Sequence, residues 1–118
     1  MSATPVRIVE RYLFDLYNAQ NVDLVYELCA DPLIRHGAGV VTKMTRSEQF
    51  ERIAADLSAH NPKFEVVTLI GDQQYASLTW NAERLITGER LCGIEIFKTE
   101  AGLITDVWNS GYFEGSWS

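Results

Sequence analysis

After Pro62 the sequence alternates between apolar and polar residues, and this alternation constrains the fold more than any other feature. Four segments keep the period of two that is typical of β-strands: "KFEVVTLI", "QYASLTWNAERLI", "RLCGIEIFK" and "LITDVWNSGYF". The segments between them contain "GD", "TGE" and "EAG", each compatible with a tight hairpin turn. Because short connections join neighbouring strands, we predict a four-stranded antiparallel meander.

The sequence before Pro62 has helical spacing instead. Apolar residues recur every three to four positions from Thr4 to about Asn18, and Pro5 suits the first turn of this helix. We expect Asn21 to cap a second, short helix, "VDLVYELC". After it, "PLIRH" is predicted to be a short strand, and "TRSE" fits a capping box that opens a third helix.

Three helices followed by four strands predict an α+β fold. The curved antiparallel sheet must pack on the helices to bury its apolar face, which gives a conical shape. A cone closed by helices at one end leaves a pocket for a ligand. The length of 118 residues fits a single domain spanning residues 1–118.

Charge and composition exclude some classes of partner. A net charge of -6 argues against nucleic acid and anionic membranes, because both require a basic surface. The start of the sequence has no apolar run of signal-peptide length, so we expect a cytoplasmic protein. Cys29 and Cys92 lack metal-ligand spacing and are predicted to be small buried hydrophobes. We therefore expect no metal.

The stretch "GIEIF" places a carboxylate within an apolar strand. Ile94 and Ile96 share one face of the strand, and Glu95 lies on the other. If the isoleucines point into the core, Glu95 is a surface residue. If they point outward, Glu95 lies inside the protein, where a carboxyl group is costly and typical of acid/base chemistry. Pairing of Glu95 with Arg84 or Arg90 is a further alternative.

Two stretches resemble a known superfamily. "VERYLFDLYNAQNVDLVYELCADPLIRHGAG" and "GIEIFKTEAGLITDVW" resemble the nuclear transport factor 2-like superfamily, in particular its SnoaL-like polyketide cyclase and ketosteroid isomerase-like branches. The resemblance implies a conical α+β barrel with a deep apolar pocket. It also implies a homodimer joined through the outer face of the sheet, and chemistry without a cofactor or metal.

The resemblance assigns candidate site residues by motif position. Tyr12 of "ERYL" matches a hydrogen-bond-donating tyrosine, and Glu95 matches a protonated carboxyl group on the oxyanion side. His36 matches the general base, with one gap in the matched stretch. Histidine replaces the aspartate of the isomerase at that position, although histidine is familiar there among SnoaL-like relatives. Alternatively, His36 is a strand-end residue bonded to backbone, and Tyr12 is a core residue.

The resulting hypothesis is an enzyme that binds a small, largely apolar carbonyl compound and moves a proton next to the carbonyl. Ketosteroid-isomerase-like isomerisation and SnoaL-like aldol cyclisation both fit. Four further residues are predicted to contact the ligand: Trp80, Arg84, Phe97 and Asn109. One alternative is a non-catalytic ligand-binding or dimerisation module. The other is an epoxide hydrolase or dehydratase, which prefers two acids around an arginine and is matched in part by Arg84 with Glu95.

Overall fold

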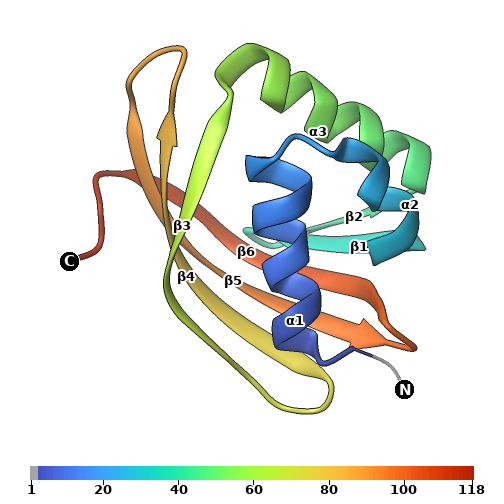
Figure 1. Cartoon of the computed structure of the whole chain (residues 1–118). Helices are drawn as coiled ribbons and strands as arrows, with labels where there is room; N and C mark the ends of the chain where they lie inside the picture. The colour runs from blue at the N-terminus through green and yellow to red at the C-terminus, as the bar shows by residue number, and fades with distance from the viewer. Residues whose placement is uncertain (1–2) are drawn as a thin grey trace.

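The computed structural model describes residues 3–118. A six-stranded sheet curls around the helices, which lie on its concave side (Figure 1). The helical elements are α1 (Pro5–Glu10), η1 (Arg11–Asn18), η2 (Val22–Leu24), α2 (Val25–Leu28) and α3 (Arg46–His60). The strands are β1 (Cys29–Gly37), β2 (Val40–Met44), β3 (Pro62–Gly71), β4 (Tyr75–Arg84), β5 (Arg90–Glu100) and β6 (Leu103–Glu114). The predicted α+β architecture is confirmed.

The strands are arranged in the order β2-β1-β6-β5-β4-β3. Strands β3 to β6 form the predicted antiparallel meander. Strand β1 lies parallel to β6 and antiparallel to β2, so the N-terminal half of the chain completes the sheet. Strand β2 was not predicted from the sequence. This strand lies at the edge of the sheet and is almost entirely exposed, so no buried apolar face marks it in the sequence.

The first predicted helix forms as two joined segments. The Thr4 hydroxyl accepts a hydrogen bond from the Arg7 amide at 3.2 Å and caps α1, which continues directly into η1. Segment η1 is a π-helix, in which the amide of one residue bonds the carbonyl five residues earlier. This winding brings Tyr12 and Tyr17, five residues apart, onto one face. Their rings stack with centroids 5.4 Å apart.

The predicted capping box of α3 is present. The Thr45 hydroxyl accepts from the Glu48 amide at 3.1 Å, and the Glu48 carboxylate accepts from the Thr45 amide at 2.9 Å. The second helix differs from the prediction, because Asn21 makes no side-chain cap and the segment divides into η2 and α2. Strand β1 begins at Cys29, three residues earlier than predicted.

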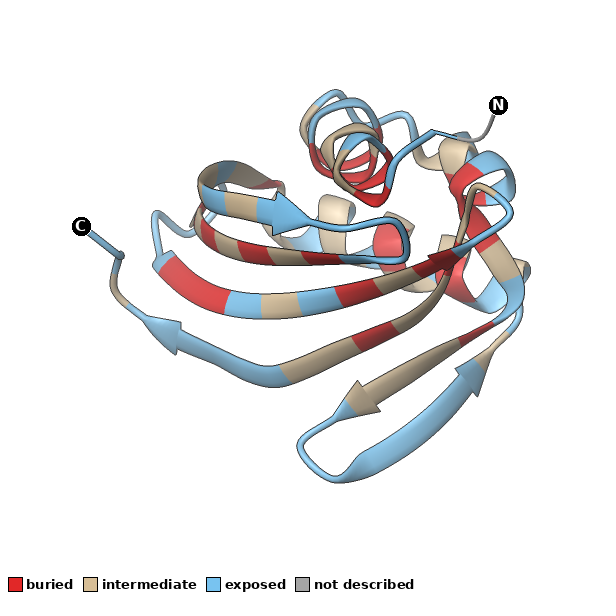
Figure 2. Cartoon of the chain, turned by 90° about the horizontal axis from the view of Figure 1, so that it is seen from below, coloured by how far each residue is buried: buried red, intermediate tan, exposed pale blue. Residues whose placement is uncertain are grey.

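The core lies between the helices and the concave face of the sheet. Buried and more exposed residues alternate along the strands (Figure 2). On β5 the side chains of Ile94 and Ile96 point outward and are 44% and 42% exposed, whereas Phe97 is buried. Cys29 and Cys92 are free and buried, as predicted. Within residues 3–118 no helix is long and apolar enough to cross a membrane.

Candidate active site

A cavity of about 180 Å³ opens between the helices and the concave face of the sheet. Its lining comes from η1, α3 and five of the six strands, so residues distant in the sequence meet there. Six of the seven predicted site residues line the cavity: Tyr12, Trp80, Arg84, Glu95, Phe97 and Asn109. The apolar part of the wall is made by Leu13, Pro62, Phe64, Leu78, Trp80, Ala82, Leu91 and Phe97.

Glu95 faces this cavity. It lies directly opposite Asn109 on the neighbouring strand, and the Asn109 amide donates a hydrogen bond to Glu95 Oε1 at 3.0 Å. Burial raises the pKa of the Glu95 carboxyl above its ordinary value, and the positive charges of Arg35 and Arg52 only partly counteract this rise. Glu95 is therefore a carboxyl group that could exchange a proton with a ligand. The Asn109 amide, which does not titrate, holds it in place.

Arg84 does not pair with Glu95. Its guanidinium donates to the Tyr112 hydroxyl at 3.1 Å and to the Glu89 carboxylate at 3.4 Å. It also lies over the Tyr112 ring, 5.4 Å from the centroid. Within residues 3–118, Arg90 forms no ion pair with Glu95 either. The two pairings considered from the sequence for Glu95 are thus absent.

The Tyr12 hydroxyl lies in a buried network of polar side chains. Gln49, which is fully buried on α3, donates from Nε2 to the Tyr12 hydroxyl oxygen at 3.1 Å. The Gln49 carbonyl oxygen in turn accepts from Arg52 Nε at 3.2 Å. Burial raises the pKa of Tyr12 well above its ordinary value, with a further contribution from Tyr17. Tyr12 therefore stays protonated and can donate its hydrogen to an acceptor in the cavity.

Trp80 forms a wall of the cavity only because residue 93 is glycine. A Cβ atom at Gly93 would lie 2.5 Å from Cζ2 of the Trp80 indole, which is closer than van der Waals contact allows. The Trp80 ring packs in this space and meets Phe64 edge-on, with ring centroids 5.2 Å apart. The aromatic wall suits a flat, apolar ligand body.

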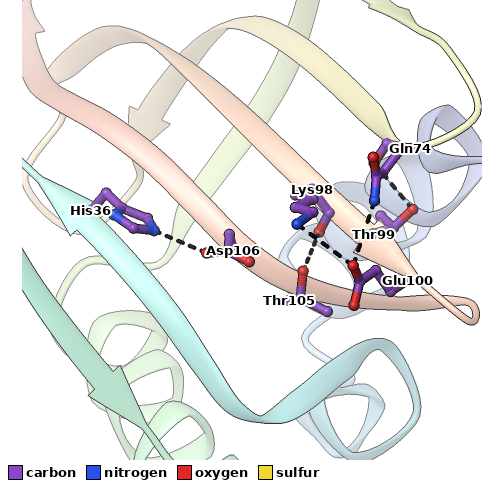
Figure 3. A network of polar contacts seen from close by, with 7 residues as sticks. All are labelled: His36, Gln74, Lys98, Thr99, Glu100, Thr105 and Asp106. Carbon is purple, nitrogen blue, oxygen red and sulfur yellow. Dashed lines mark hydrogen bonds and ion pairs between the residues drawn. The ribbon is translucent and has the colours of Figure 1, made fainter.

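The prediction that His36 lies at this site is wrong. His36 Nε2 lies 2.9 Å from Asp106 Oδ2 on the outer face of the sheet (Figure 3). The His36 ring also stacks on Trp108, with centroids 4.6 Å apart. Side chains alternate along β1, so the neighbouring residue Arg35 points into the cavity instead. A one-residue difference in alignment exchanges the two faces of a strand.

Solved structures of other proteins have the same fold. Superposition on a protein from Kribbella flavida, proposed to be a ketosteroid isomerase, gives a TM-score of 0.78 at 16% identity, covering 97% of this chain and 81% of that chain. A SnoaL-like polyketide cyclase from Agrobacterium tumefaciens gives 0.75 at 19% identity, covering 94% and 92%. An LEH-like epoxide hydrolase from Mycobacterium tuberculosis gives 0.75 at 15% identity, covering 90% and 80%.

The chain has the nuclear transport factor 2-like fold. The resemblance inferred from the sequence is thus confirmed at the level of the fold. No protein-family model and no curated protein sequence matches the chain.

Three charged residues of the cavity in this nuclear transport factor 2-like fold were missed by the sequence analysis: Arg35, Arg52 and Asp56. Two of them follow a helical pattern, because Gln49, Arg52 and Asp56 are spaced three and four residues apart on α3. This polar stripe lies beside the apolar stripe of the same helix and could have been noticed. No sequence pattern marked Arg35 as a cavity residue, because the face of the sheet on which its side chain lies depends on the register of β1.

The outer face of the sheet carries a second, more open hollow of about 570 Å³. His36, Ile94, Ile96 and Trp108 line it, together with Val40 and Val41 of β2. Two separate ion pairs lie on the neighbouring strands here: His36 with Asp106 at 2.9 Å, and Lys98 with Glu100 at 3.5 Å (Figure 3). Within residues 3–118 no group of three His, Cys, Asp or Glu side chains is arranged to hold a metal ion.

Proposed function

We propose that the cavity binds a small, largely apolar carbonyl compound and that Glu95 moves a proton on the carbon next to the carbonyl, without a cofactor. The observation that carries this proposal is the Glu95 carboxyl, which lies among apolar side chains, is fixed by Asn109 and has a raised pKa. An ordinary carboxylate is a weak base toward carbon acids. A pKa raised toward the working pH makes proton transfer more effective.

In the proposed reaction the Glu95 carboxylate removes a proton from the carbon next to the carbonyl. The electrons of the broken C–H bond form the enolate, and the negative charge develops on its oxygen. Tyr12, Arg35 and Arg52 are the donors available in the cavity for that oxygen. Isomerisation ends when Glu95 returns the proton to another carbon. Aldol cyclisation ends when the enolate carbon attacks a second carbonyl carbon, whose oxygen becomes an alkoxide and takes the proton back from Glu95.

This assignment changes the roles predicted from the sequence. Glu95 takes the role of the base, because His36 lies on the opposite face of the sheet. The oxyanion donors are then Tyr12 and the two arginines. The fold similarity to proteins described as a ketosteroid isomerase and a polyketide cyclase supports the same class of chemistry.

Hydrogen–deuterium exchange tests the proposal across a range of candidate substrates. A panel of one-ring ketones and β,γ-unsaturated ketones is incubated with the protein in D₂O, and exchange next to the carbonyl is followed by NMR. We expect at least one compound to exchange with wild type, and Glu95→Gln to lose that activity. Glu65→Gln, an exposed glutamate of β3, is the matched control. Equal exchange by wild type and Glu95→Gln would refute the role of Glu95.

A second candidate reaction is epoxide hydrolysis. Asp56 and Glu95 both line the cavity together with Arg52, which gives two acids and an arginine in one site. One acid would protonate the epoxide oxygen while the other activates water, so that a C–O bond forms to water and the ring C–O bond breaks. Asp56→Asn should then abolish diol formation from small epoxides and leave ketone exchange intact. Loss of ketone exchange alone would not support this candidate.

A further inference from the structure

The cavity holds two arginines without a carboxylate partner. Acidic side chains outnumber Lys and Arg by 16 to 10 in the chain, and within residues 3–118 Arg7, Arg11 and Arg84 form ion pairs with them. Nevertheless, no Asp or Glu oxygen within residues 3–118 lies within 4.0 Å of the guanidinium nitrogens of Arg35 or Arg52. Both side chains are partly buried in the cavity wall. A partly buried guanidinium group without an ionic partner is costly and favours binding of an anion.

Neither acidic residue of the cavity, Glu95 or Asp56, forms an ion pair with Arg35 or Arg52. Burial favours the neutral form of Glu95, and one of its oxygens is occupied by the Asn109 amide. Asp56 lies one turn from Arg52 on α3 but forms no ion pair with it. The third arginine of the lining, Arg84, is already paired with Glu89. Arg52 Nε already donates to Gln49, so the terminal nitrogens of Arg52 and the Arg35 guanidinium are the groups available to an incoming anion.

The volume of the cavity limits the body of that anion. An apolar cavity of about 150 Å³ holds one benzene molecule. The 180 Å³ found here accommodates one six-membered ring with a small polar substituent, and a larger body would extend out of the cavity. The aromatic side chains of Phe64, Trp80 and Phe97 provide flat surfaces for such a ring.

We propose that the ligand is an oxo acid of one-ring size, whose carboxylate binds Arg35 and Arg52 while its ring packs on the aromatic wall. A guanidinium group recognises a carboxylate with two parallel hydrogen bonds, which gives specificity for acids over esters and amides. The part of the inference that concerns the oxo group rests on the proposed function, because it places a carbonyl near Glu95. For such an acid the two arginines bind the carboxylate, and Tyr12 is the donor that remains for the enolate oxygen.

Calorimetric titration with two matched probes tests the inference. Benzoylformate carries the carboxylate, the oxo group and one ring, and methyl benzoylformate has the same body without the charge. Neither has a hydrogen next to its ketone carbonyl, so binding is measured without turnover. We expect wild type to bind the acid at least about tenfold more tightly than the ester, since hydrogen bonds between charged groups are the strong ones.

Three arginine variants locate the effect. Arg35→Gln and Arg52→Gln should each remove most of the preference for the acid. Arg90→Gln, an exposed arginine outside the cavity, removes the same charge and should retain the preference. Circular dichroism checks that each variant is folded, and the comparison of acid with ester in wild type does not depend on the variants.

Each contrary result identifies what has failed. An ester bound as tightly as the acid by wild type, or no binding of either probe at millimolar concentration, would overturn the inference. A preference for the acid that survives in both cavity variants would overturn the assignment to Arg35 and Arg52. The exchange assay with neutral ketones is independent of these titrations, so the proposed function can fail or stand separately.

Discussion

Replacement of Glu95 by glutamine should stabilise the protein increasingly as pH rises. The substitution keeps the size of the side chain and an oxygen that can accept the Asn109 hydrogen bond, which is 3.0 Å long in wild type. It removes only the titration. The difference in unfolding free energy between the two proteins therefore reports the ionisation of Glu95 in its folded environment.

The sign follows from the raised pKa. Burial favours the neutral carboxyl group in the folded protein, whereas the unfolded chain has the ordinary glutamate pKa of about 4.3. The stabilising contribution of Glu95 is thus complete below the unfolded-state pKa. It is lost as pH rises and levels off above the folded-state pKa. Each unit between the two pKa values corresponds to about 1.4 kcal/mol of free energy lost by wild type and not by Glu95→Gln.

Denaturant unfolding at pH 4, 5.5 and 7 measures this difference. We expect Glu95→Gln to gain stability relative to wild type between pH 4 and 7. The exposed control Glu65→Gln should stay within about 0.5 kcal/mol of wild type at every pH. A flat difference for Glu95→Gln would mean that burial does not perturb the carboxyl. A reversed trend would mean that Arg35 and Arg52 dominate, and would refute the reasoning behind the proposed base.

Three further predictions concern the rest of the molecule. If the outer sheet face joins a homodimer, as the resemblance implies, charged replacements of Ile96 and Trp108 should give monomers in sedimentation, and an unchanged mass would exclude that interface. Dialysis against a chelator should leave the melting temperature unchanged, whereas a fall would contradict metal-independent function. Gly93→Ala should cost about 1 to 3 kcal/mol in denaturant unfolding because its methyl group collides with Trp80, whereas Gly37→Ala, which meets nothing within 4 Å, should be nearly neutral.

The parts of the fold that follow from local chemistry could be predicted from the sequence. The meander from Pro62 onward rests on alternation along each strand, and the start of α3 rests on the reciprocal hydrogen bonds of Thr45 and Glu48. Strand β2 could not be predicted in this way. Its position depends on pairing with β1 alone, and an exposed edge strand needs no apolar alternation.

Some features of the site could likewise be predicted from local sequence patterns, and others could not. Alternation along the strand put Glu95 on the face opposite Ile94 and Ile96 but left open which face is the inner one, and the family resemblance supplied that choice. The contact between Tyr17 and Tyr12 could not be predicted from the sequence. An α-helix aligns residues three or four apart, and only the π-helical winding of η1 brings Tyr17 beside Tyr12.

The finding that Arg35, and not His36, faces the cavity has the largest consequence for the proposed chemistry. A histidine in the cavity would supply a neutral base near physiological pH, whereas an arginine supplies a permanent cation that cannot accept a proton. The proton acceptor must then be a carboxylate, and among the lining residues only Asp56 and Glu95 qualify. Arg35, which occupies the place expected for the histidine base, would also strengthen the binding of an anion. If both proposals hold, one residue of register on β1 decides both which group transfers the proton and which charge the ligand carries.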